Sequence, residues 1–139
     1  MLPGEIYRHE AFYFSASGRP EAKYLLVLAV PRGQDMVARL LTSEPHGRPE
    51  IPPCYHGLPY GGFFLGVPGQ PLTQKTWVDL RYLDDFDPDD FRKREAKAVL
   101  SCVCALPPNV LRTVIECVAG ADDTTKRQER CLRDTLARF

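Results

Sequence analysis

Apolar residues in the first part of the chain come in short runs that have the length of β-strands. Residues 4–14 (GEIYRHEAFYF) mix apolar and polar positions, and the segments 23–30 (KYLLVLAV) and 36–43 (MVARLLTS) are nearly continuous apolar runs. Such runs, closed by proline or glycine, predict strands buried on both faces. The short connection PRGQD between the last two predicts a hairpin. We therefore expect 23–30 and 36–43 to be the central strands of an antiparallel sheet, after a loop over SASGRPEA.

Two further segments later in the chain have the composition of strands. These are residues 76–83 (TWVDLRYL) and 98–106 (AVLSCVCAL). Side chains of a strand alternate between its two faces, so Cys102 and Cys104 are expected on the same face of the second segment.

Helical signals alternate with these strands. Asp87 before Pro88 predicts the start of a short, solvated helix. Residues 109–120 (NVLRTVIECVAG) carry apolar residues at helical spacing and end at a glycine, which predicts an amphipathic helix docked on the sheet. A last helix over about 122–139 is expected to be capped by Asp122 and by its neighbour Asp123. The narrow apolar face of this helix consists of Gln128, Leu132, Thr135, Leu136 and Phe139. We expect this face to pack on its own domain or, less often, on a second subunit.

The segment 44–74 interrupts this pattern. It holds more than half of the 13 prolines and more than half of the 10 glycines, which excludes a regular helix. One short strand, 62–67 (GFFLGV), is expected within it. The order of elements predicts one domain over 1–139, mainly β, built as an antiparallel barrel or half-barrel with helical additions.

Composition and charge narrow the classes of function. The chain has 139 residues, with 18 basic and 18 acidic side chains that cancel, so no global field attracts a polyanion and a nucleic acid would need a local patch. No apolar run approaches the roughly 20 residues that span a bilayer. The first residues do not resemble a secretory signal, so we expect a cytoplasmic protein. Five cysteines, an odd number, then favour reduced thiols over a disulfide framework.

The loop PPCYHGLPYGGFFLG, residues 52–66, places Cys54 two positions before His56. A thiol nucleophile would need a neighbouring cation or helix N-terminus and an oriented base, and no such partner is evident. A zinc site would need two further ligands, which Cys102 and Cys104 could provide. We favour a third interpretation, a loop held by packing of its aromatic residues Tyr55, Tyr60, Phe63 and Phe64.

Common nucleotide, protease and esterase motifs are absent from the sequence. What remains is a set of polar residues at strand ends, where a small barrel can present groups on one rim. Lys23 opens one apolar run, Thr42 and Ser43 close the next, and Asp79 and Arg81 lie in the later strand. Each is separately explained as a turn hydroxyl or an exposed charge, but together they fit a recognisable pattern.

The order of GEIY, SASGRPEA, KYLLVLAV and MVARLLTS resembles the opening of the MazF/PemK family of toxin endoribonucleases. TWVDLRYLDDFD and AVLSCVCALPPNVLRTVIECV are similar to the later strand, closing strand and C-terminal helix of that family. The resemblance implies an SH3-like small β-barrel with C-terminal helices, a homodimer, and neutralisation by a cognate antitoxin protein. It also implies cleavage of single-stranded RNA without a metal or other cofactor, by attack of a ribose 2′-hydroxyl on the adjacent phosphate.

The resemblance assigns catalytic roles by position. Thr42 and Ser43 match the hydroxyl pair of the family, and Asp79 matches an acidic residue used by some members. Lys23 stands where the family has its catalytic arginine, and Tyr24 replaces the proline that follows it. Lysine stabilises phosphate charge as a point cation but lacks the two-pronged guanidinium fork.

Substrate-binding roles follow from the same resemblance. A guanidinium for the phosphate is expected from one of three arginines, Arg19, Arg39 or Arg81. Stacking on RNA bases is expected from Tyr55 and Tyr60. These tyrosines belong to an insertion at about 45–75 that, with the extra C-terminal helix at about 122–139, exceeds the usual family length. An alternative function is therefore a non-catalytic barrel that binds a protein partner through this insertion and the last helix.

Overall fold

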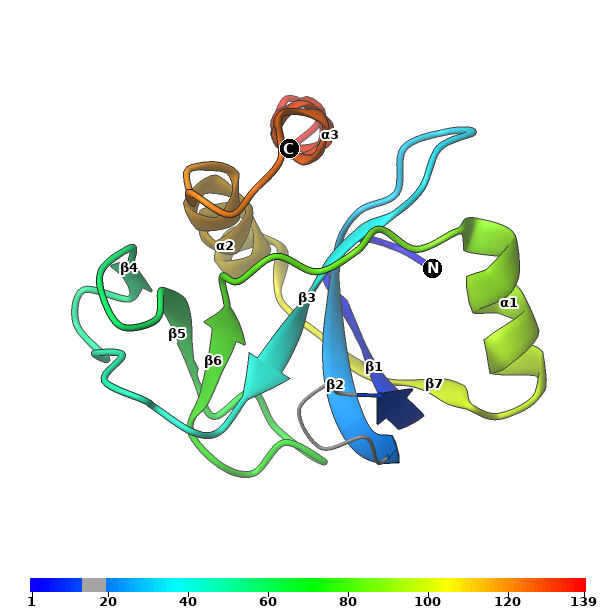
Figure 1. Cartoon of the computed structure of the whole chain (residues 1–139), viewed down its shortest axis with the longest axis horizontal. Coiled ribbons are helices and arrows are strands. Elements are labelled where there is room, and N and C mark those ends of the chain that lie inside the picture. The colour runs from blue at the N-terminus through cyan, green and yellow to red at the C-terminus, as the bar shows by residue number, and fades with distance from the viewer. Residues whose placement is uncertain (14–19) are drawn as a thin grey trace.

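The protein is described by a computed structural model that covers residues 1–13 and 20–139, so most of the expected SASGRPEA loop lies outside the described residues. Over these described residues the protein is mainly β, with a seven-stranded antiparallel sheet and three helices (Figure 1). The elements are β1 (Glu5–Tyr13), β2 (Pro20–Ala29), β3 (Val37–Thr42), β4 (Cys54–Tyr55), β5 (Gly62–Gly66), β6 (Thr76–Asp79), α1 (Pro88–Ala96), β7 (Leu100–Ala105), α2 (Pro108–Ala119) and α3 (Lys126–Leu136). The strand order in the sheet is β4-β5-β6-β3-β2-β1-β7.

Strand β2 is central in the sheet, as its continuous apolar run predicts. It pairs with β1 on one side and with β3 on the other, and every residue from 25 to 29 is fully buried. The β2–β3 hairpin is confirmed, with Tyr24 opposite Leu41 and Leu26 opposite Arg39. Consecutive apolar residues are needed here because helices or loops cover both faces of the strand.

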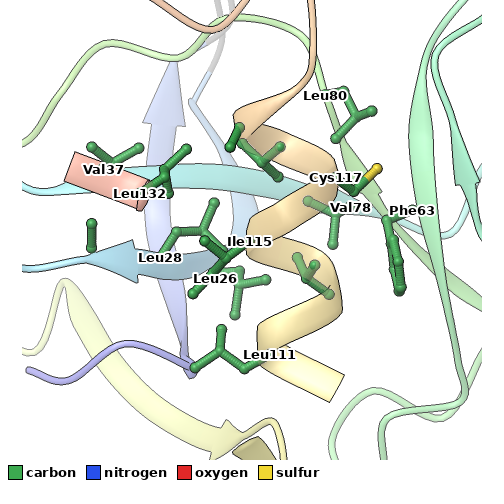
Figure 2. Close-up of a cluster of buried hydrophobic side chains, with 14 of the residues drawn as sticks. Leu26, Leu28, Val37, Phe63, Val78, Leu80, Leu111, Ile115, Cys117 and Leu132 are labelled. Atoms are coloured by element: carbon green, nitrogen blue, oxygen red, sulfur yellow. The ribbon is translucent and has the colours of Figure 1, made fainter. Parts of the chain in front are cut away.

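Two hydrophobic cores lie on opposite faces of the sheet. Ile6 of β1 joins the core under α2 and α3, whereas its neighbour Tyr7 joins the core under α1 and the chain that precedes it. In Figure 2, Leu26 and Leu28 of β2 point toward Ile115 of α2. The amphipathic helix expected at 109–120 is thus confirmed as a helix docked on the sheet.

The helix starts are confirmed in part. The Asp87 side chain caps α1 by accepting from the Asp89 N–H, as expected. The expectation that Asp122 and Asp123 cap the last helix is wrong, because α3 begins only at Lys126. There Thr125 is the N-cap and forms a reciprocal capping box with Gln128, which satisfies two backbone N–H groups at once. The apolar face of α3 packs on its own domain through Leu132 and its neighbours.

The sheet is not a closed barrel. Within the described part of the chain, β4 and β7 are its two edges and do not pair with each other. Strand β4 has only two residues, so it offers few backbone groups for closure. The expected SH3-like barrel is therefore not confirmed. The expected mainly β architecture with helical additions is observed.

Two strands depart from their expected form. Strand β6 ends at Asp79 because that side chain accepts a hydrogen bond from the Arg81 N–H at 3.0 Å, which competes with further pairing. Strand β7 carries an extra residue opposite β1: Tyr7 pairs with Cys102 and Ile6 with Cys104. Such a bulge breaks the alternation, so the expectation that both cysteines share a face is wrong. Among the helices that the structure describes, none is long and apolar enough to cross a bilayer.

Candidate functional site

Three of the expected catalytic residues line one cleft. Lys23, Thr42 and Ser43 face a hollow of about 440 Å³ at the start of β2 and the end of β3. They meet there because Tyr24 pairs with Leu41, so the antiparallel hairpin sets the first residues of one strand beside the last residues of the other. The opposite wall is the chain between β5 and β6, which includes residues 71–74.

The cleft is polar and carries both signs of charge. The Glu44 N–H donates to the Thr42 hydroxyl oxygen at 3.1 Å, so the hydroxyl hydrogen is directed elsewhere and can be donated to a bound group. Lys23 Nζ lies 3.5 Å from a carboxylate oxygen of Glu21. Glu44 also lines the cleft, beside further hydrogen-bonding side chains from Thr73, Gln74 and Thr76. The arrangement suits a ligand that presents both anionic oxygens and hydroxyl groups.

Asp79 lies outside this cleft and is held by two arginines. Its carboxylate is 2.7 Å from Nη2 of Arg81 and 3.2 Å from Nη2 of Arg48. The side chains of Arg48 and Asp79 are only 1% and 6% exposed, whereas that of Arg81 is 51% exposed. Burial alone would raise the pKa of Asp79, but hydrogen bonds and charge from Arg81, with the charge of Arg48, hold it below its ordinary value. Asp79 is therefore a stable carboxylate that positions two guanidinium groups, not a proton acceptor in the cleft.

Tyr60 lies against the same two arginines. Its ring centre is 5.3 Å from the guanidinium carbon of Arg48 and 4.8 Å from that of Arg81. Arg48 also donates from Nε to the Gly61 carbonyl oxygen at 2.8 Å. Arg48 was missed by sequence reasoning, because nothing in PHGRPE distinguishes a buried arginine from an exposed one. Tyr55, the other tyrosine expected to stack on bases, instead donates its hydroxyl to the Leu58 carbonyl oxygen at 2.7 Å.

Arg39 has no access to a substrate in this structure. It is fully buried between β3 and α3, and it donates to Gln128 Oε1 at 3.0 Å and to the Ala38 carbonyl oxygen at 2.9 Å. Burial lowers its pKa, and nearby carboxylates such as Asp85 oppose that effect. The expectation that Arg39 contacts phosphate is corrected to a structural role, holding α3 to the sheet. Arg19, the remaining candidate, lies outside the described residues.

Cys54 is joined to Cys117 by a disulfide, so the expectation of reduced cysteines is wrong for this pair. The β4–β5 pairing places β4 beside α2, which brings the two Cα atoms within 5.8 Å although 63 positions separate the residues in sequence. His56 Nε2 lies 3.4 Å from Cys54 Sγ and 3.5 Å from Cys117 Sγ. The expected partners Cys102 and Cys104 lie on β7, at the other edge of the sheet, so a zinc site of the composition considered from the sequence is not assembled.

Comparisons of the chain with protein-family models, with curated proteins and with solved structures find no match. Function must therefore be argued from the cleft and from the residues that surround it.

Proposed function

We propose that the chain is a metal-independent endoribonuclease that binds single-stranded RNA in the cleft formed by Lys23, Thr42 and Ser43. The observation that carries the proposal is that these three residues, selected from the sequence, line one cleft. The resemblance to the MazF/PemK toxins extends the proposal to a toxin of a toxin–antitoxin module, acting as a homodimer and neutralised by a cognate antitoxin.

The chemistry proposed for this cleft needs no group from outside the chain and the RNA. A base takes the proton of the ribose 2′-hydroxyl, whose oxygen then bonds to the adjacent phosphorus while the bond from phosphorus to the 5′ oxygen breaks. Glu44 supplies a carboxylate in the cleft and is the proposed base, whereas Asp79, expected from the resemblance to be catalytic, lies outside the cleft. Lys23 stabilises the charge of the phosphorane and can protonate the leaving 5′ oxygen, and the hydroxyls of Thr42 and Ser43 donate to phosphate oxygens. The products are a 2′,3′-cyclic phosphate and a 5′-hydroxyl.

Loss of either central group should slow the reaction. We expect Thr42→Ala and Lys23→Ala each to lower the cleavage rate by about 100-fold or more, the usual cost of removing one preorganised donor at a developing charge. The measurement is gel analysis of long single-stranded RNA incubated with purified protein in EDTA. Matched controls are Thr113→Ala, an exposed threonine of α2, and Lys75→Ala, an exposed lysine paired with Glu50. Equal cleavage by the wild type and both cleft variants would exclude this site.

A second candidate function is binding of a protein partner without catalysis. The observation that favours it is the exposure of apolar side chains in the 45–75 insertion, where Ile51 and Leu58 are 88% and 87% exposed. Expression in a bacterial host separates the two candidates. A toxin stops growth and loses that effect on Thr42→Ala substitution, whereas unaffected growth at high expression, with no RNA cleavage, favours the binding module.

A further inference from the structure

The side chains of Cys54, Cys117 and His56 bring three metal-binding atoms together. Both sulfur atoms and a ring nitrogen of the histidine lie within 4.8 Å of one another. Cys54 lies in β4, His56 follows two residues later, and Cys117 lies in α2. The cluster therefore connects the 45–75 insertion to the helix layer. None of the three residues lines the cleft of Lys23 and Thr42.

We propose that this cluster is a redox-controlled zinc site. In the dithiol form of the protein, Cys54, Cys117 and His56 bind one Zn²⁺, and oxidation of the two cysteines to the observed disulfide releases it. The inference is independent of the proposed RNA cleavage, which uses no metal.

The distances around His56 fit a tetrahedral zinc ion. Zinc bonds of about 2.3 Å to sulfur and about 2.0 Å to nitrogen place ligand sulfur and nitrogen roughly 3.5 Å apart. The observed separations of His56 Nε2 from Cys54 Sγ and Cys117 Sγ are 3.4 and 3.5 Å. Reduction of the disulfide breaks the sulfur–sulfur bond, and the two sulfurs then separate toward the roughly 3.8 Å expected across one zinc ion.

The fourth coordination position is left to a water molecule. Three protein ligands with one open position are a common zinc arrangement. A hollow of about 160 Å³ borders the cluster on the side of His56, and Asp122 and Asp123 also line it, so water can reach the histidine from this side.

The proton on His56 must differ between the two forms. In the disulfide form, Nε2 lies 2.9 Å from the Cys117 carbonyl oxygen, a distance at which a protonated Nε2 donates to it. Zinc needs the lone pair of Nε2, so the metal-bound form requires the neutral tautomer with its proton on Nδ1. His56 is exposed, so water can accept a hydrogen bond from Nδ1–H in the metal-bound form.

The oxidation step balances with a small-molecule disulfide as the oxidant. The thiolates of Cys54 and Cys117 give up two electrons and form one sulfur–sulfur bond. The disulfide bond of the oxidant breaks, and the oxidant takes the two electrons together with two protons from solvent and leaves as two thiols. Zn²⁺, having lost two ligands, leaves to water.

The test measures metal binding by the full chain in both redox forms. We expect the reduced protein to bind one equivalent of Zn²⁺ and the oxidised protein to bind none, and oxidised glutathione should release zinc from the loaded protein. Co²⁺ in place of zinc should give the absorption bands of a tetrahedral, thiolate-bound ion. His56→Ala should weaken zinc binding by at least about tenfold, since even outer-shell partners of zinc ligands have effects of that size. The matched control is Cys102→Ser, which removes an exposed free cysteine and should bind zinc as the wild type does.

Several outcomes would overturn the proposal. The proposal is wrong if the reduced wild-type protein binds no zinc. It is also wrong if the reduced and oxidised forms bind zinc equally. Unchanged zinc binding by the His56→Ala variant would show that the imidazole is not a ligand. The wild-type comparison needs no substitution, so it remains decisive if a cysteine variant fails to fold.

Discussion

An Asp79→Ala variant is expected to lose about 3 kcal/mol of its free energy of unfolding, because removal of one partner leaves a buried charge uncompensated. The charge concerned is that of Arg48, whose side chain is almost inaccessible to water. Three backbone carbonyl oxygens, including that of Gly61, also accept hydrogen bonds from Arg48 and limit the loss. The half-exposed Arg81 contributes little, because its pairing with Asp79 is screened by solvent.

Urea unfolding followed by circular dichroism measures this effect. The matched control is Glu50→Ala, which removes an exposed carboxylate paired with Lys75 and should change the free energy of unfolding by less than about 1 kcal/mol. Asp79→Asn keeps the shape of the side chain, but it removes the charge and replaces one acceptor oxygen with an N–H₂ donor that would face the arginines, so it should also be less stable than the wild type. A loss for Asp79→Ala no larger than that for Glu50→Ala would contradict the structural role of Asp79.

The lowered pKa of Asp79 makes the stability of the fold depend on pH. Because this pKa is lower in the folded protein than in the unfolded chain, the carboxylate stabilises the fold above the unfolded value and that contribution is lost as the pH falls through the folded value. We expect the stability of the wild type to decrease below about pH 4, where an ordinary aspartate begins to take up its proton. The decrease should be smaller in Asp79→Asn, measured by thermal unfolding at matched ionic strength.

This structural role changes how activity measurements on the chain are interpreted. Loss of RNA cleavage in an Asp79→Ala variant would not identify a catalytic carboxylate, because the same substitution disturbs Arg48 and the Tyr60 ring that lies against it. Variants of Thr42 and Lys23, which line the cleft, test the chemistry without that complication.

The central part of the fold could be predicted because its signals are local. Strands β2 and β3 are consecutive apolar runs joined by a short turn, and α2 repeats its apolar residues at the helical period. The meeting of Lys23 with Thr42 and Ser43 is also local in this sense, since a hairpin sets the ends of its two strands together. The sheet edges could not be predicted in the same way, because a two-residue strand such as β4 has no periodic pattern.

Polar residues were harder to place, because their burial depends on distant partners. Asp79 and Arg48 pair across 31 positions, and no sequence pattern connects them. Arg39 did carry a signal: its neighbours Val37 and Leu41, two positions away on either side, both face the core under α2 and α3. Strand alternation therefore predicts a buried Arg39, whereas an argument from its charge predicts an exposed one.

Reduction of the Cys54–Cys117 disulfide in the presence of a metal chelator is expected to lower the free energy of unfolding by about 4 kcal/mol. The estimate follows from the entropy that a cross-link over 63 positions removes from the unfolded chain. Reduction deletes no side-chain atoms. The measured loss of stability therefore does not include the cost of the cavity that Cys117→Ala would leave in the core. The measurement is urea unfolding of oxidised protein and of reduced protein in EDTA.

Two comparisons make this result specific to the cross-link. Cys102→Ser, at an exposed free cysteine, should show the same difference between oxidised and reduced protein as the wild type. A Cys54→Ala, Cys117→Ala double variant should be insensitive to reductant, whatever its own stability. Equal urea midpoints for oxidised and reduced wild type would mean that the cross-link does not stabilise the fold. The reduced wild type should recover stability when Zn²⁺ replaces EDTA, and the double variant should not. That result would show that the metal connects residues 45–75 to α2, because a ligand that binds only the folded chain stabilises it.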